Sequence, residues 1–507
     1  MKSIFRWLWF MIPIALFFLG VNLLLVFYWL FTHFHTTNFN ALVIYLNLPR
    51  ENLPLDAIDR EHYVYGLAVQ FACGLALTAT FAWLRALCRR RETIFGLGAR
   101  RFGFAMWLTA ILSLSGSLYA FETRYDIGKH LFADAGYASY VEDHFQPPRA
   151  EEIVFPGEKR NLILLILESV ETTVNDPKLF QAKLMPRLDD IGKKNLAFSG
   201  YRPTTGTTSS LLSFYSLNLG MPFVTYPLAL FTWDSAEGPK LDPLNLNVGK
   251  FAERHDFRDR SLLGVMERNG YRVEMLTGAD IRAFAYDRLI RMSTDHCGIY
   301  DRNYFQASRA DCSGHMNAWG IDDSYLYARA RERLLAVQGG GKPFFSIIQT
   351  VNTHPPGFYE KGRPRKFGDF RDSFEQGDAM AGEFIEWILA QPFARETAIV
   401  VMGDHNLAIS GLGPIRLPPT EKREIMLIFI NSAPGRPKRG QRRAFAAWDL
   451  APTILEAAGA RVPGRRFGLG TSLFSDRDTL LERDGLEKFN EMITKRSRLY
   501  EKSYYWY

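Results

Sequence analysis

The chain has 507 residues, of which 47% are hydrophobic and 23% are charged, and its 61 basic and 54 acidic residues leave a formal net charge of +7. A chain of this length exceeds the usual size of one domain, so at least two domains are expected. The positive excess is small for this length and no DNA- or RNA-binding motif accompanies it, so we expect no nucleic-acid partner.

Three apolar segments near the N-terminus are each long enough to span a bilayer as a helix, which takes about 20 residues. They are Trp7–Phe31, Tyr63–Cys88 and Phe102–Phe121. The first segment is too long for a signal peptide and has no small-residue cleavage site, so it predicts an anchor. Basic residues before it and in the loop 89–101 predict that both lie in the cytoplasm, which places everything after residue 121 outside. The shorter apolar run Phe39–Leu48 favours an interfacial or re-entrant segment.

The rest of the chain predicts a linker, one catalytic domain and a tail. Proline and glycine pairs mark residues 122–160 as a juxtamembrane linker, and residues 476–507 read as a helical tail. Between them, residues 161–475 alternate apolar runs with helical patterns, which predicts an α/β domain with a mostly parallel sheet between helices. The predicted strands are Leu162–Leu167, Arg272–Leu276, Phe344–Thr350, Ala398–Met402 and Ile425–Ile430. The predicted helices are Met185–Lys194, Leu211–Leu219, Ser261–Asn269, Asp323–Val337, Asp378–Ala390 and Leu450–Ala458.

Two of the four cysteines, Cys297 and Cys312, fall in the part expected outside the membrane. They are close in sequence, and an oxidising compartment permits a disulfide between them. A pair of free thiols is the equal alternative.

Polar residues follow two of the predicted strands where each strand ends. Glu168 comes directly after one apolar run, and Asp404 and His405 come directly after another. Each residue alone is more often a helix cap or a loop residue. Ligands of open α/β sheets bind outside the carboxyl ends of the strands, however, and a hydroxyl-rich turn, Gly206–Ser210, opens a helix between these two positions. Their joint placement predicts one functional site.

Two carboxylates, one imidazole and one hydroxyl form a hard, mostly oxygen ligand set. Such a set suits Mn²⁺ or Mg²⁺, and it accepts Zn²⁺ where an imidazole takes part. A metal-bound hydroxyl loses its proton more easily and becomes a nucleophile near neutral pH. The N–H groups at the start of the helix would point at a phosphoryl anion. This combination predicts phosphoryl-type chemistry.

The motifs, taken in order, resemble the sulfatase-like branch of the alkaline phosphatase superfamily over about residues 161–460. Within that branch the chain is most similar to membrane-anchored transferases, namely lipoteichoic acid synthases, periplasmic glucan phosphoglycerol transferases and lipopolysaccharide phosphoethanolamine transferases. The matching pieces are Leu167–Ser169, Asn218–Pro222, Thr277–Arg282, Thr353–Gly357, Gly403–His405 and Asp449–Ile454. The resemblance implies an alkaline-phosphatase-like fold for the exported domain.

The resemblance also implies that Glu168, Asp404 and His405 hold a metal together with the nucleophile. Two-metal phosphatases of the superfamily have a histidine two residues before the aspartate of the Asp-Leu-Ala-Pro-Thr motif, and this chain has Ala447 there. One divalent ion, Zn²⁺ or Mn²⁺, is therefore expected, and simple phosphomonoester hydrolysis is disfavoured.

The nucleophile is expected among the hydroxyls that open the helix. In the superfamily it stands ten residues before a glycine near the helix end, and counting back from Gly220 gives Ser210. The family's transferases mostly use threonine, which keeps Thr208 and Thr207 as alternatives. The sulfatase pattern of a modifiable nucleophile followed by proline and arginine is absent at both Ser210 and Thr208. Sulfate-ester hydrolysis is therefore disfavoured.

Four further residues are expected to face the substrate. By resemblance, His354 lies beside the substrate phosphate or the leaving group, and a simple turn residue is its alternative. Arg282 would clamp a phosphate oxygen, and an exposed salt bridge is its alternative. His296 and His315 are expected to contact the head group, or else only flank the proposed Cys297–Cys312 bridge.

The expected enzyme is a bacterial inner-membrane protein with its catalytic domain in the periplasm. It would move the head group of phosphatidylethanolamine or phosphatidylglycerol, through a covalent phospho-enzyme, to an envelope glycan such as lipopolysaccharide core or a periplasmic glucan. Ethanolamine is slightly preferred over glycerol. Two alternatives remain, which are a hydrolase that releases the head group to water and a membrane sensor with an inactive site.

Overall fold

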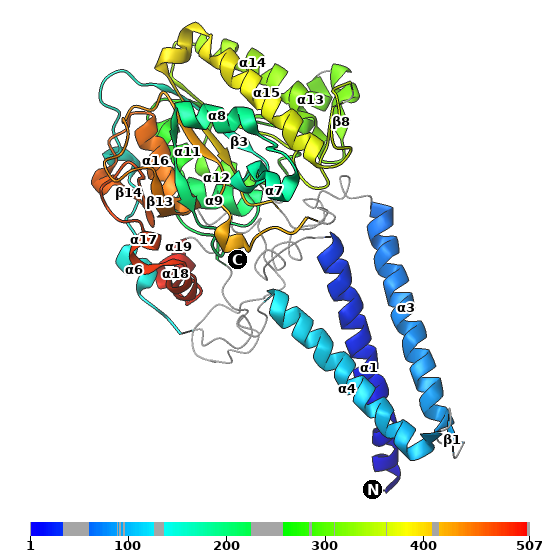
Figure 1. The fold of residues 1–507 in the computed structure, drawn as a ribbon. Coiled ribbons are helices and arrows are strands. Elements are labelled where there is room, and N and C mark those ends of the chain that lie inside the picture. The colour runs from blue at the N-terminus through cyan, green and yellow to red at the C-terminus, as the bar shows by residue number, and fades with distance from the viewer. Residues whose placement is uncertain are drawn as a thin grey trace. The chain divides into compact units, whose positions relative to one another are not determined.

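The computed structural model describes residues 2–33, 60–88, 90, 93–94, 97–125, 136–224, 257–282, 286–308, 310–360, 362–407 and 415–503. These residues fall into two compact units, one before residue 126 and one after residue 135 (Figure 1). The predicted interfacial segment Phe39–Leu48 lies outside the described residues.

The first unit contains the three predicted spans. Its helices are α1 (Lys2–His33), α3 (Arg60–Leu87) and α4 (Ala99–Tyr125), and a two-stranded hairpin of β1 (Thr93–Ile94) and β2 (Leu97–Gly98) precedes α4. The parts long and apolar enough to cross a membrane are Trp7–Trp29, Gly66–Leu87 and Ala99–Thr123, which confirms the prediction. A side chain at Gly20 of α1 would meet Leu114 N of α4 at 2.6 Å, so glycine is what permits this close helix contact.

One arginine compensates for a proline inside α1. Pro13 has no N–H to donate to Trp9 O, four residues earlier. Arg85 of α3 donates through Nη2 to Trp9 O and through Nε to Phe10 O, the latter at 3.0 Å. Its Nη1 also donates to Gly103 O of α4 at 3.3 Å. The Arg85 guanidinium therefore satisfies carbonyl groups next to the proline and links all three helices.

We expect this pair to be energetically coupled. Arg85→Met should lower the unfolding midpoint of the protein in detergent, because it leaves Trp9 O without a donor. Pro13→Ala restores the backbone N–H, so Arg85→Met should cost less in that background, with a coupling of about 1 kcal/mol. A double-mutant cycle on the unfolding midpoint measures this, and strictly additive effects would contradict the assigned role.

The second unit is built around one seven-stranded sheet, in the order β4-β12-β11-β3-β10-β6-β7. The strands are β3 (Asn161–Leu167), β4 (Leu196–Ala197), β6 (Arg272–Thr277), β7 (Gly298–Tyr300), β10 (Phe344–Gln349), β11 (Thr397–Gly403) and β12 (Leu427–Ile430). Strands β11, β3, β10, β6 and β7 run parallel, and β12 pairs antiparallel with both β11 and β4. The predicted, mostly parallel sheet and all five predicted strands are confirmed.

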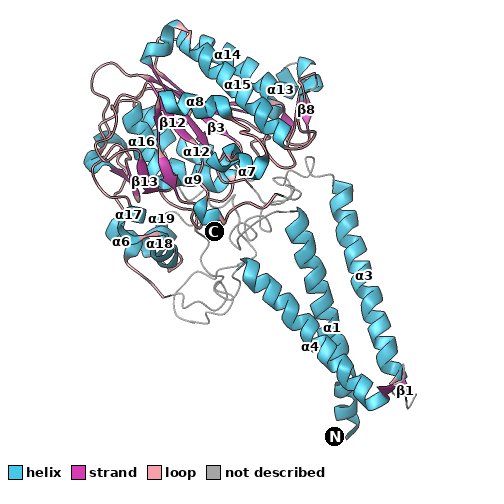
Figure 2. Ribbon diagram, viewed as in Figure 1, coloured by secondary structure: helices cyan, strands magenta, loops and turns pink. Residues whose placement is uncertain are grey.

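Helices cover both faces of this sheet (Figure 2). Alternate residues of β3 enter two different hydrophobic clusters, which explains why its sequence is a continuous apolar run. One face is covered by α9 (Ser210–Leu219), α11 (Leu262–Arg268), α12 (Tyr286–Ser293) and α16 (Leu450–Ala457). The other is covered by α7 (Pro177–Phe180), α8 (Pro186–Lys194), α14 (Asp323–Gln338) and α15 (Arg371–Leu389).

The remaining elements are short. They are α6 (Tyr140–His144), β5 (Ser199–Tyr201), α13 (Arg302–Ser308), β8 (Met316–Asn317), β9 (Gly320–Ile321), β13 (Arg442–Phe445), β14 (Arg466–Phe467), β15 (Gly470–Thr471), α17 (Leu480–Asp484), α18 (Leu486–Ile493) and α19 (Arg498–Ser503). The core extends beyond the range 161–475 expected for the catalytic domain. Tyr140 and Ile153 from the expected linker, and Phe489 and Tyr500 from the expected tail, are buried in it.

The disulfide considered for Cys297 and Cys312 is absent, because both thiols are free. Cys297 packs against the cluster that contains the main sheet, whereas Cys312 is buried in a separate small cluster with Phe305 and Tyr325. Proximity in sequence therefore did not bring the two sulfur atoms together.

Candidate functional site

The predicted site lies at the carboxyl ends of three neighbouring parallel strands. β3 pairs with β11 on one side and with β10 on the other, and Gly403 lies opposite Leu167 in the register. Glu168 therefore follows the central strand, while Asp404 and His405 follow one neighbour. At Gly403 a Cβ would lie 1.8 Å from Val170 O, so only glycine allows the chain after β3 to pass this close.

Glu168, Asp404 and His405 form a compact buried cluster. One ligand atom from each lies within 4.8 Å of the others. His405 Nε2 is 3.4 Å from Glu168 Oε1 and 3.6 Å from Asp404 Oδ2. His405 Nδ1 donates to Asn406 O at 2.9 Å, so Nε2 is the ring nitrogen that faces the two carboxylates.

Backbone N–H groups hold the carboxylate of Asp404, and a hydroxyl group holds that of Glu168. Asp404 Oδ1 accepts hydrogen bonds from Ser169 N and His405 N, each at 2.8 Å. Ser169 adopts a left-handed backbone conformation with φ of 56°, which is uncommon for a side chain other than glycine and turns its N–H toward Asp404. The Ser169 hydroxyl donates to Glu168 Oε1 at 2.8 Å. Glu168 N in turn donates to Thr350 Oγ1 at 3.0 Å, which ties β3 to the end of β10.

A buried ion pair holds Asn406 and Leu407, the two residues after His405. Glu171 and Arg423 are 0% and 2% exposed, and Arg423 Nη1 donates to Glu171 Oε2 at 2.9 Å. The same oxygen accepts from Asn406 Nδ2 and Leu407 N. Neither Glu171 nor Arg423 was predicted, because a lone Glu or Arg in a loop gives no signal that it is buried.

Among the predicted nucleophiles, Ser210 is the residue whose hydroxyl contacts the cluster. It is the first residue of α9, its Oγ donates to Glu168 Oε2 at 3.0 Å, and the same Oγ lies 3.4 Å from His405 Nε2. Thr207 is turned toward Thr204 instead and donates to its carbonyl at 3.1 Å. Thr208 lies two residues before α9 begins. The N-terminus of α9 therefore presents Ser210 and the free N–H groups of its first turn at one place.

The residues fit one divalent metal. Asp404 Oδ2 is buried and has no hydrogen-bond partner among the described residues, which is costly unless a ligand binds it. Together with Glu168, His405 and Ser210 it offers two carboxylate oxygens, one hydroxyl oxygen and one imidazole nitrogen, the donor set expected for Mn²⁺ or Zn²⁺. The protein itself would bind and orient the ion through these four side chains.

The pKa values reflect the same concentration of negative charge. Burial and the neighbouring charge of Glu168 raise the pKa of Asp404 to about 7. Burial also opposes ionisation of Glu168, but its hydrogen bond with His405 outweighs this and holds the pKa of Glu168 below its usual value. Burial lowers the pKa of His405, and the two carboxylates more than offset this and raise it to about 10. The cluster thus favours a positive charge at its centre.

Comparison with known proteins identifies the family. The family model described as Sulfatase matches residues 160–460, which is more than half of the chain. The chain belongs to the sulfatase family. The cluster of Glu168, Asp404 and His405 lies entirely within the matched residues.

Two curated relatives are phosphoglycerol transferases I. The enzyme of Escherichia coli is 25% identical over 416 residues, and that of Salmonella paratyphi B is 26% identical over 415 residues. Each match covers 79% of this sulfatase-family chain and 49% of the relative, so the chain spans about half the length of the curated relatives it matches.

A solved structure is similar in fold. A protein of the alkaline phosphatase superfamily from Vibrio parahaemolyticus gives a TM-score of 0.50 at 18% identity, and the match covers 71% of this chain and 79% of that protein. The expected fold, an alkaline-phosphatase-like α/β domain after N-terminal membrane helices, is thereby confirmed.

In this sulfatase-family site, His354 lies next to the cluster. It follows β10, its Nδ1 is 2.8 Å from Pro355 O, and its ring centroid is 3.8 Å from that of Trp319. Burial lowers the pKa of His354, and the charge of Glu168 partly offsets this. Trp319 was not predicted, because nothing in the sequence connects the turn between β8 and β9 with the end of β10.

The other three residues predicted to contact the substrate pair with carboxylates on the surface instead. Arg282 pairs with Asp280 at 3.0 Å and has 61% of its side chain exposed. His296 lies 3.2 Å from Glu267 with its side chain 88% exposed. His315 Nδ1 lies 3.0 Å from Asp322 Oδ2. Of the candidate residues, the structure thus brings together Glu168, Ser210, His354, Asp404 and His405.

Proposed function

We propose that this protein is a membrane-bound transferase that moves the glycerol phosphate head group of a phospholipid to an envelope glycan, with Ser210 as the covalent nucleophile. The observation that carries the proposal is the position of Ser210 Oγ, 3.0 Å from Glu168 at the N-terminus of α9 and beside His405. The curated phosphoglycerol transferases support the reaction class. The bacterial inner membrane, with the catalytic domain in the periplasm, is the proposed location.

In the first half-reaction Ser210 loses its proton to solvent and its Oγ bonds to the phosphorus of the head group. The bond between phosphorus and the diacylglycerol oxygen breaks, and that oxygen takes a proton from His354, which enters the step protonated because the bound phosphate anion offsets its lowered pKa. The contact of His354 Nδ1 with Pro355 O leaves Nε2 free to carry this proton. The N–H groups of the first turn of α9 stabilise charge on the phosphoryl oxygens.

In the second half-reaction a glycan hydroxyl gives its proton to His354 and bonds to phosphorus, and Ser210 Oγ leaves and regains a proton. A divalent metal at Glu168, Asp404 and His405 supplies positive charge that favours the ionised hydroxyl and the phosphoryl anion. The same His354 serves both halves because it donates in one and accepts in the other.

The proposed donor is phosphatidylglycerol rather than phosphatidylethanolamine. The sequence-based preference was for ethanolamine, but the matched curated relatives are phosphoglycerol transferases. Arg282, His296 and His315 remain proposed head-group contacts only if their present partners, Asp280, Glu267 and Asp322, are exchanged for substrate.

The test uses the full chain in vesicles that contain phosphatidylglycerol labelled in its glycerol head group or phosphatidylethanolamine labelled in its ethanolamine head group. We expect label to move from phosphatidylglycerol to an added β-glucan, and diacylglycerol to accumulate in equal amount. Transfer from phosphatidylethanolamine alone would replace the donor. Release of free glycerol phosphate at the same rate with and without glucan would show a hydrolase instead. No turnover of either lipid with metal present would favour the inactive sensor.

A further inference from the structure

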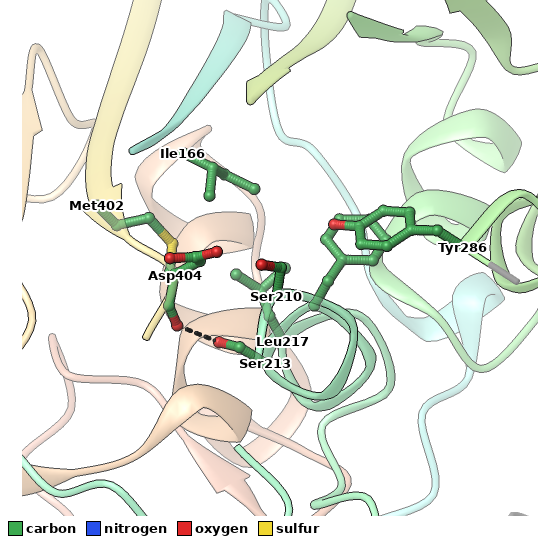
Figure 3. A pocket seen from close by; sticks show the side chains of 8 residues that line it. Ile166, Ser210, Ser213, Leu217, Tyr286, Met402 and Asp404 are labelled. Atoms are coloured by element: carbon green, nitrogen blue, oxygen red, sulfur yellow. Dashed lines mark hydrogen bonds between the residues drawn. The ribbon is translucent and has the colours of Figure 1, made fainter. Parts of the chain in front are cut away.

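A small cavity lies under α9, between this helix and the carboxyl ends of β3 and β11 (Figure 3). Its volume is about 10 Å³. Its lining is Ile166, Ser210, Ser213, Phe214, Leu217, Tyr286, Met402 and Asp404. The cavity therefore touches both Ser210 and Asp404, but neither Glu168 nor His405 lines it.

Two polar atoms of this lining are buried without a hydrogen-bond partner among the described residues, namely Tyr286 Oη and Asp404 Oδ2. Tyr286 is held against Phe214, with the ring centroids 4.7 Å apart, and its phenol oxygen points into the cavity toward Ser210 (Figure 3). Ser213 is already satisfied, because its Oγ donates to Asp404 O at 2.6 Å. The buried Tyr286 hydroxyl lacks a partner among these residues, which is rare and unfavourable, and Asp404 Oδ2 can still accept a hydrogen bond when it also binds a metal.

The size and chemistry of the cavity match one water molecule. A buried water needs a cavity volume of at least about 10 Å³ and two to four polar partners. Tyr286 Oη, Asp404 Oδ2 and Ser210 Oγ provide three, and the rest of the lining is mostly apolar. Burial and the nearby carboxylates Asp404 and Glu168 hold the pKa of Tyr286 well above its usual value, so its hydroxyl stays protonated and donates.

We propose that this cavity binds a single water molecule that links Tyr286 to Asp404 and Ser210, and that Tyr286 is a positioning residue for the nucleophile. The water accepts a hydrogen bond from Tyr286 Oη and donates to Asp404 Oδ2 and Ser210 Oγ. Ser210 Oγ itself donates to Glu168 Oε2, so the water approaches its lone pairs from the opposite side. A donor at that place holds the oxygen in line and stabilises it when it loses its proton.

The water site does not depend on the reaction assigned to the protein, whereas the kinetic role of Tyr286 rests on the proposed function. The test therefore has a structural, a thermal and a kinetic arm. Tyr286→Phe removes only the phenol oxygen. The matched control is Tyr271→Phe, because Tyr271 Oη is likewise buried without a partner among the described residues and Tyr271 packs on Phe155, not at the cluster.

A high-resolution crystal structure should show one water peak within hydrogen-bonding distance of the three partners, and Tyr286→Phe should lose or displace it. Tyr286→Phe should also unfold at a lower temperature than Tyr271→Phe. The first substitution removes the hydrogen bond between Tyr286 and the water, whereas the hydroxyl removed in the control makes no hydrogen bond to any described residue. An empty cavity, an anomalous metal peak in it, or a Tyr286→Phe midpoint at or above that of the control would each overturn the water site.

In the kinetic arm, Tyr286→Phe should slow formation of the Ser210 adduct about tenfold, the worth of one hydrogen bond, with little change in KM for the lipid. Tyr271→Phe should leave the rate unchanged. A normal rate for Tyr286→Phe in a protein whose cavity does hold the water would overturn the positioning role and leave the water site and the proposed function intact.

Discussion

Replacing Ser210 with alanine is expected to abolish head-group transfer, with a loss of at least about 10³-fold, because the covalent route has no nucleophile without Oγ. Thr208→Ala is the matched control, since it removes a hydroxyl two residues earlier on the same turn. It should keep most of the activity. The rates are measured as diacylglycerol release from phosphatidylglycerol vesicles at saturating Mn²⁺.

The reverse result, an active Ser210→Ala enzyme and an inactive Thr208→Ala enzyme, would move the nucleophile to Thr208 and require the start of α9 to rearrange. Both variants should unfold at nearly the wild-type temperature. Ser210 is partly exposed and its hydroxyl makes one hydrogen bond of good length, to Glu168, so little stability depends on it.

Asp404→Asn is expected to remove metal binding. The wild-type protein should gain about 2.7 kcal/mol of stability at a metal concentration 100 times its Kd, because the metal binds only the folded site. The variant should show no such gain, and its transfer rate should fall by about 10³-fold, since the metal supplies several kcal/mol of charge stabilisation. Unfolding midpoints in chelator and in Mn²⁺ or Zn²⁺ measure the first effect.

Asp378→Asn is the matched control for this experiment. Asp378 is also a buried carboxylate with a pKa raised by burial, to about 6, but it accepts hydrogen bonds from Arg187 N and Leu188 N at the start of α8. Its substitution should lower stability equally with and without metal. A metal-dependent gain in Asp404→Asn equal to that of the wild type would contradict the proposed ligand set.

The sheet could be predicted because its strands are buried on both faces. β3 and β11 read as unbroken apolar runs, and their ends are marked by a charged residue. The edge strands β4 and β7 have only two and three residues and carry no pattern of that kind, so they were missed. Short edge strands are fixed by their neighbours rather than by their own sequence.

The start of α15 was placed seven residues late, at Asp378 instead of Arg371. Residues 371–377 are mostly polar and end in a glycine, which weakens the helical signal. The buried carboxylate of Asp372 stabilises this first turn by accepting hydrogen bonds from the N–H groups of residues 366, 367 and 368. Such a contact between a loop and a helix start is invisible before the chain is folded.

The meeting of Glu168, Asp404 and His405 could be anticipated because parallel strands bring their carboxyl ends to one edge, so these residues had to meet if their strands were neighbours. Trp319 and Tyr286 could not be anticipated in the same way. They reach the site from elements that do not adjoin it in sequence, and aromatic residues in such positions are more often plain core residues. For Arg282 the sequence left two alternatives, a phosphate clamp and a salt bridge, because a charged residue after a strand can equally pair with a near neighbour, and the structure shows it paired with Asp280.

The most direct test of the account is the mass of the peptide that contains residues 206–219 after the full chain has been incubated with phosphatidylglycerol and metal, without an acceptor. The account predicts a glycerol phosphate adduct, located by fragmentation on Ser210 and lost when a glucan is added. Consumption of the lipid with the peptide unmodified at every time point, from the first turnover onward, would contradict a covalent transfer through Ser210.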